Sequence, residues 1–160
     1  MHVTLRWVGL TAAFVMLAAC GGSNPSSGVA SPSPSPSSTG SKVAVATNAK
    51  LGQILADDKG MTLYLFVADT GTASTCYTSC ASIWPPLLTD GAPQAGTGAD
   101  ASKLGTTNRT DGKVEVTYAG HPLYYFVQDK APGDTKGQGI NGFGGLWWVV
   151  SPSGAAITTK

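Results

Sequence analysis

Two cysteines and one histidine are the residues of this sequence that come nearest to a metal or redox site. Cys76 and Cys80 are separated by three residues, and His121 precedes Pro122 at a predicted turn. Thiolates and an imidazole suit Cu(I), so one hypothesis is a copper or redox accessory protein that uses Cys76, Cys80 and His121. The alternative is a disulfide, because so short a segment can bring two cysteine Cα atoms within the ~4.4–6.8 Å that a bridge requires.

Other metal and cofactor chemistries fit these residues less well. A structural zinc site needs four ligands, whereas the sequence after Cys20 holds two cysteines and one histidine. A covalently attached haem requires Cys-x-x-Cys-His, and Ala81 follows Cys80. An even pair of cysteines in an exported domain usually forms a disulfide. We therefore predict a Cys76–Cys80 bridge, no metal and no cofactor.

Three aspartates are the remaining candidates for chemistry. Asp69 and Asp129 each end a predicted strand, and Asp134 follows in a glycine-rich segment. A carboxylate in this position commonly accepts hydrogen bonds from backbone N–H groups of the following turn. The alternative is a group of acids that binds a hard cation or acts as general acid and base. After Cys20 the sequence has no second histidine and no Gly-x-Ser-x-Gly elbow to accompany them, so we predict no catalytic residue and a non-enzymatic protein.

Asp69 and Asp129 belong to a motif that occurs twice, at an offset of 60 residues. Six of the ten positions in residues 60–69 and 120–129 are identical, which indicates an internal duplication. The identical pairs are Gly60 and Gly120, Leu63 and Leu123, Tyr64 and Tyr124, Phe66 and Phe126, Val67 and Val127, and Asp69 and Asp129. A second match, at an offset of 63, aligns Trp84 with Trp147. The repeats extend over about residues 50–95 and 113–158, and we expect the motif aromatics in the core.

The hydrophobic pattern predicts an all-β fold. Strands are expected at 43–46, 61–68, 113–118, 123–127, 146–150 and 155–158, and a long loop or short turns at 90–112. No window has a capped helical period. The strand at 113–118 alternates, which predicts Glu115 on its exposed face. Two repeats suit one pseudo-symmetric domain, a small sandwich or barrel. Trp147 and Trp148 point to opposite faces of their strand, so we expect Trp148 to be partly exposed and, with His121, a candidate binding residue.

The N-terminal part of the sequence predicts the localisation of the protein. Residues 1–19 hold Arg6 and an apolar run that is too short to span a bilayer, as in a secretory signal. The run ends Leu-Ala-Ala-Cys20, which resembles a bacterial lipobox and implies cleavage before Cys20 and diacylglycerol on its sulfur. Residues 20–42 are rich in Ser and Pro and predict a disordered linker, followed by the folded domain at 43–160. We expect a lipid-anchored protein on the outer face of the cell membrane.

Charge narrows the range of partners. Only 12% of the residues are charged, the net charge is +1, and no basic run is present. A nucleic-acid partner needs a basic patch, so none is expected. The expected partners are the membrane, which the protein contacts through its lipid anchor, and a small molecule or protein in the envelope.

The combined pattern resembles the bacterial secreted-repeat lipoproteins, whose mark is a Tyr-x-(Phe/Trp/Tyr)-x-x-Asp motif. The likeness rests on both motif copies, on the cysteine pair before Trp84-Pro85-Pro86, and on the segment from Pro132 to Gly139. It covers about residues 50–152. The resemblance implies an extracytoplasmic lipoprotein and adds no chemistry, because the role of the family is unassigned. We therefore predict a binding or envelope-associated module, with the copper or redox accessory as the alternative.

Overall fold

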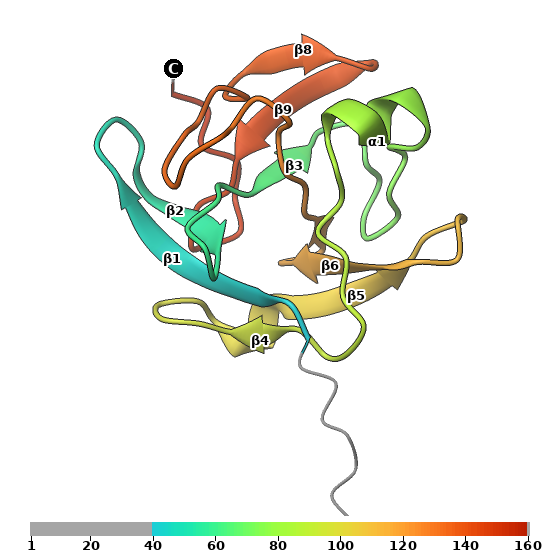
Figure 1. Ribbon diagram of the computed structural model, residues 1–160, viewed down its shortest axis with the longest axis horizontal. Coiled ribbons are helices and arrows are strands. Elements are labelled where there is room, and N and C mark those ends of the chain that lie inside the picture. The colour runs from blue at the N-terminus through green and yellow to red at the C-terminus, as the bar shows by residue number, and fades with distance from the viewer. Residues whose placement is uncertain (1–39, 160) are drawn as a thin grey trace, which may run out of the picture. The chain divides into compact units, whose positions relative to one another are not determined.

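The computed structural model describes residues 40–159 (Figure 1). The strands are β1 (Lys42–Asn48), β2 (Gly52–Asp57), β3 (Tyr64–Phe66), β4 (Gln94–Ala95), β5 (Leu104–Asn108), β6 (Val114–Tyr118), β7 (His121–Pro122), β8 (Ile140–Gly142) and β9 (Gly145–Val149). One short helix, α1 (Ser79–Ile83), and one 3-10 turn, η1 (Ala101–Lys103), accompany them. The predicted all-β class is therefore confirmed. The predicted signal peptide, Cys20 and the linker up to residue 39 lie outside the described residues.

The strands form three small sheets, ordered β2-β1-β4, β3-β9-β8 and β5-β6-β7. β1 and β2 are an antiparallel hairpin whose turn is held by the Asn48 side chain, which accepts from the N–H groups of Lys50 and Leu51. In Figure 1, β8 and β9 lie above β3, and β5 and β6 lie below it. None of the three sheets of the described domain closes into a barrel. No helix of this part is long and apolar enough to cross a membrane.

The two repeats interlock, because the motif strand of each repeat pairs with the tryptophan segment of the other. β3, in the first repeat, pairs antiparallel with β9, in the second, and the N–H of Val67 extends this ladder to the carbonyl of Leu146 at 3.0 Å. The second repeat returns the contact: the N–H of Val127 donates to the carbonyl of Ile83, also at 3.0 Å. Neither repeat therefore completes its own ladder.

A local two-fold axis runs between the two motif tyrosines. The N–H of Tyr64 donates to the carbonyl of Tyr124 at 2.8 Å, and the N–H of Tyr124 donates to the carbonyl of Tyr64 at 2.9 Å. These residues are equivalent at the offset of 60, so each bonds to its own counterpart. Such self-pairing places the axis between them.

Two triangles of backbone hydrogen bonds, one on each side of the axis, explain why the regular strands are short. In each triangle, three residues from three segments donate in turn to the next. The first joins Leu55, Leu63 and Val150, and the second joins Val116, Leu123 and Leu87, at N···O distances of 2.8–3.1 Å. Successive residues thus bond to different segments. The predicted strand at 61–68 narrows to β3, and the predicted strand at 123–127 forms bridges instead of a regular strand.

Three other expectations about the elements were wrong. The segment 90–112, predicted as a long loop or short turns, contains the strands β4 and β5 beside the turn η1. The predicted last strand at 155–158 is reduced to the single bridge Val150↔Ala156. α1 forms where no helix was expected. A helix this short carries too few turns to show a period of 3.6 residues.

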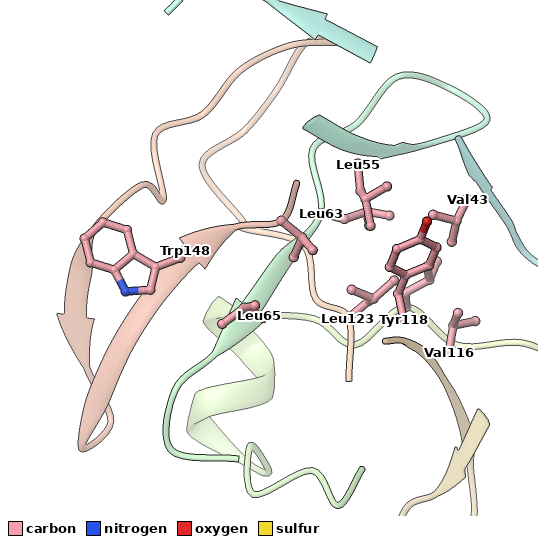
Figure 2. Packing of buried hydrophobic residues seen from close by; sticks show 10 residues of the cluster. Val43, Leu55, Leu63, Leu65, Val116, Tyr118, Leu123 and Trp148 are labelled. Atoms are coloured by element: carbon pink, nitrogen blue, oxygen red, sulfur yellow. The ribbon is translucent and has the colours of Figure 1, made fainter. Parts of the chain in front are cut away.

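The core consists of two clusters of buried side chains on opposite faces of the central strands. Figure 2 shows the first, in which Leu55, Leu63 and Tyr118 gather while Trp148 lies apart on the β9 side. Trp147 points to the other face and enters the second cluster. The tryptophans do face opposite ways, but Trp148 is only 7% exposed, so the predicted exposure was wrong. Both faces of β3 and of the last three residues of β9 are therefore buried.

Gly137 provides a test of the packing around the axis. A Cβ added there would lie 2.7 Å from Cη2 of Trp84 and 2.9 Å from Cε1 of Tyr64, and both rings are buried. We expect Gly137→Ala to lower the free energy of unfolding by about 1–3 kcal/mol, as overpacking does in a filled core.

Gly142→Ala is the matched control in a urea titration. Its Cβ would meet only Cγ2 of Ile140, at 3.9 Å. This variant should stay within about 0.5 kcal/mol of the wild type. Equal stabilities of the two variants would contradict the close packing at Gly137.

Candidate functional site

A column of four aromatic rings crosses the two-fold axis. Trp84 and Trp147 stack at 4.1 Å with an interplanar angle of 4°. Phe66 continues the stack on Trp147 at 4.0 Å, and Phe126 continues it on Trp84 at 4.3 Å. Each ring of one repeat therefore has its equivalent in the other. All four are buried, which confirms the prediction that Phe66 and Phe126 are core residues.

The motif tyrosines and aspartates bond reciprocally across this column. The Tyr64 hydroxyl donates to Oδ2 of Asp129 at 2.6 Å, and the Tyr124 hydroxyl donates to Oδ2 of Asp69 at 2.6 Å. The tyrosine of each repeat is thus fixed by the aspartate of the other. A hydrogen bond to a charged acceptor is short and about twice as strong as a neutral one, so these bonds hold the two halves in register.

The second carboxylate oxygen of each aspartate binds the loop that follows. Oδ1 of Asp129 accepts from the N–H of Lys136 at 2.9 Å, and Oδ1 of Asp69 accepts from the N–H of Thr75 at 2.7 Å. The expected bonding to backbone N–H groups is therefore confirmed. The sequence reasoning missed the tyrosine partners, although the fixed Tyr-x-Phe-x-x-Asp spacing in both copies was a signal that the two residue types act together.

The protons of these pairs reside on the tyrosines. Burial and the Asp129 carboxylate raise the pKa of Tyr64, and burial, Glu115 and Asp69 raise that of Tyr124. Burial also raises the pKa of Asp129, while the bond from Tyr64 lowers it. The tyrosines act as neutral donors and stay protonated well above neutral pH.

The structure does not gather the three candidate aspartates into one acid site. Asp69 and Asp129 are each bound to a different tyrosine and a different loop. Asp134 accepts from the N–H groups of Lys130 and Ala131 and pairs with Lys136 at 3.1 Å. Each carboxylate therefore has a role in holding a turn.

The two cysteines form the predicted disulfide, with a Cα–Cα distance of 5.2 Å. Both sulfurs are used in this bond, so they are not thiolate ligands. His121 is half-buried in β7 and pairs with Tyr118. Within residues 40–159, no group of three or more His, Cys, Asp or Glu side chains could hold a metal ion. The copper hypothesis for Cys76, Cys80 and His121 was wrong, because the bridge consumes two of its three ligands.

A polar cluster, made of half-buried Ser74 and buried Arg109 and Glu115, lies beneath the disulfide loop. Nη1 of Arg109 donates to Oε2 of Glu115 at 2.7 Å and to the Ser74 hydroxyl at 2.9 Å, and Nη2 donates to the Cys76 carbonyl at 2.8 Å. The Tyr124 hydroxyl lies 2.7 Å from Ser74. Arg109 thus ties the loop to the second repeat.

Glu115 is fully buried, so the expected exposure of this face of β6 was wrong. Its neighbour Arg109 replaces water as the partner of the carboxylate, which is how an alternating strand can bury a charged residue. Oε1 of Glu115 has no hydrogen-bond partner among the described residues. Burial raises the pKa of Glu115 to about 7, against the lowering by Arg109, and the Asp69 charge adds to the rise. The sequence pattern carried no signal for Arg109, which lies in a loop.

Both halves of the domain match one family. Residues 45–88 and residues 105–151 each match the family described as a secreted repeat of unknown function. The two segments cover more than half of the 160 residues, so the chain belongs to this family and carries two of its repeats. No curated protein and no solved structure matches the chain. The protein is extracytoplasmic, with a role that the family leaves unassigned.

Because the tyrosine–aspartate bonds join the two repeats, we expect the loss of one tyrosine hydroxyl to destabilise the fold. We expect Tyr64→Phe to lower the free energy of unfolding by about 1–3 kcal/mol, because it leaves Oδ2 of buried Asp129 without its donor. Chemical denaturation at neutral pH measures this. Tyr77→Phe is the control, since the Tyr77 hydroxyl meets only the exposed N–H of Thr110 at 3.2 Å. A loss no larger than that of the control would contradict the role of the Tyr64–Asp129 bond.

The raised pKa of Glu115 predicts that the stability of the fold depends on pH. Its pKa is about 7 in the folded protein and ordinarily 4.5, so between these values the folded state holds a proton that the unfolded chain has lost. The free energy of unfolding therefore falls as pH rises through this window, by an amount on the order of 3 kcal/mol, and levels off above it.

The Glu115→Gln variant lacks this titration. We expect the stability of the wild type minus that of Glu115→Gln to fall from pH 5 to pH 8 in a series of urea titrations. Asp111→Asn, at an exposed carboxylate beside the same arginine, is the control and should not remove this fall. A wild-type-minus-variant difference that is flat with pH would show that Glu115 does not bind the proton.

Proposed function

We propose that the protein is a lipid-anchored binding module on the outer face of the cell membrane. The observation that carries the proposal is the match of both halves to a secreted repeat, in a chain that also has a lipobox-like Leu-Ala-Ala-Cys20 sequence. Two or more acyl chains anchor a protein stably. The Ser- and Pro-rich residues 21–41 suit a spacer between the anchor and the domain.

A binding role, rather than a catalytic one, is supported by how the repeated polar residues are used. The carboxylates of Asp69 and Asp129 accept bonds from tyrosines and from loop backbone, and thereby hold the repeats together. A general acid or base must have its carboxyl group free to reach a substrate. The duplication has copied scaffold residues, which leaves function to the less symmetric surface.

The anchor is tested by Cys20→Ala. We expect the wild-type chain to partition into the detergent phase in Triton X-114 and to incorporate labelled palmitate, because its acyl chains are buried in micelles. The variant should stay in the aqueous phase and remain unlabelled. Ser23→Ala, a change in the adjacent linker, is the control and should behave as the wild type. A labelled, detergent-soluble Cys20→Ala protein would contradict the proposal.

A further inference from the structure

A cavity of about 350 Å³ opens where the chain enters the domain. The start of β1, the turn after β2 and Tyr125, which lies within the second motif, meet there. The side chains that matter are Lys42, Asp57, Asp58, Lys59, Leu87 and Tyr125. The volume is within the range of ~300–1,000 Å³ that small-molecule sites occupy, and none of the sequence motifs accounts for the cavity.

Asp57 and Tyr125 form a rigid wall. Asp57 is buried, and its Oδ1 accepts from the N–H groups of Lys59 and Met61 at 2.9 and 2.8 Å. Its Oδ2 accepts from the Tyr125 hydroxyl at 3.0 Å. Burial and the Asp57 charge raise the pKa of Tyr125, so the phenol stays a donor. The Tyr125 ring is thereby fixed next to buried Leu87. Both carboxylate oxygens of Asp57 already have hydrogen-bond partners within the protein.

Three further charged side chains surround this wall. Lys42, Asp58 and Lys59 are exposed, and within residues 40–159 none of them takes part in an ion pair or a side-chain hydrogen bond; the ion pairs there join other residues. Two cations and one anion therefore face one cavity without neutralising one another. They are available to a ligand.

The signs of these charges select the ligand. A purely anionic molecule would meet Asp58, and a purely cationic one would meet Lys42 and Lys59, as like charges. A neutral apolar molecule would displace water from all three groups without pairing them, which is unfavourable. A molecule with one carboxylate and one ammonium group pairs with both signs, and charge-assisted hydrogen bonds are the stronger ones.

We propose that this cavity binds a zwitterionic small molecule the size of an amino acid or a dipeptide. Its carboxylate lies toward Lys42 and Lys59, its ammonium group toward Asp58, and its apolar part against Tyr125 and Leu87. The site rests on the proposed function, because it names the ligand class of the binding module. It is independent of the anchor, which is at Cys20.

The test is a titration of the purified ¹⁵N-labelled full chain, in detergent micelles, with the dipeptide alanyl-alanine. We expect saturable shifts of the backbone amides of Lys42, Asp58, Lys59 and Tyr125. N-acetyl-alanyl-alanine, which lacks the cation, and alanyl-alanine amide, which lacks the anion, should bind at least about tenfold more weakly, as the loss of one charge-assisted contact implies. Equal binding of all three probes, or no saturable shift at these amides, would overturn the proposal.

Three variants locate the site. Asp58→Asn and Lys59→Gln should each weaken alanyl-alanine binding by about tenfold, and neither side chain has a packing role that its loss would disturb. Lys50→Gln is the matched control, because Lys50 lines a separate cavity beside Asn48 and Lys136; its affinity should be unchanged. Weakening by Lys50→Gln alone would place binding at the other cavity and overturn the assignment.

The two proposals fail separately. If the titration shows no zwitterion binding while Cys20→Ala still releases the protein from detergent, the ligand class is wrong and the anchor stands. If Cys20→Ala remains in the detergent phase while the titration saturates, the anchor is wrong and the ligand site stands.

Discussion

The fold depends on the reciprocal bonding of the two motif copies. Tyr64 and Asp129 form one pair and Tyr124 and Asp69 the other, and the tyrosines also exchange backbone hydrogen bonds on the two-fold axis. The Tyr-x-Phe-x-x-Asp spacing follows from this geometry. The tyrosine reaches across the axis, the phenylalanine two positions later points the same way and joins the aromatic column, and the aspartate caps the strand where the tyrosine of the other copy arrives. A substitution at any of these positions therefore alters contacts of both repeats.

Outside this symmetric frame the two halves differ in their loops and in single side chains. The loop after Asp69 carries the disulfide and lies over Arg109 and Glu115, whereas the loop after Asp129 passes Gly137 close to Trp84. Tyr125, which forms the wall of the proposed site, corresponds to Leu65 in the first repeat. The two halves therefore share a scaffold, and at this position one half is polar where the other is apolar.

Much of the scaffold could be predicted from the sequence, but its connections could not. The repeat, the all-β class, the buried motif aromatics and the Cys76–Cys80 bridge follow from residue types and spacing. The pairing of β3 with β9 does not, because periodicity reports which face of a strand is buried and carries no information about its partner. Trp148 and Glu115 show the same limit. An alternating pattern predicts two faces, yet it cannot tell that a second layer covers the outer face or that Arg109 arrives from a distant loop.

The interlocked ladders also set the order in which the chain can fold as it crosses a membrane. A chain exported from its N-terminus delivers β3 and Trp84 well before β9 and Trp147. Until the last strand emerges, Phe66 and Trp84 lack the rings on which they stack, and the backbone of β3 lacks its partner. Contacts between distant segments slow folding and leave apolar surface open to aggregation. In such a chain the β3-β9 ladder and the aromatic column stay incomplete until the second half has emerged.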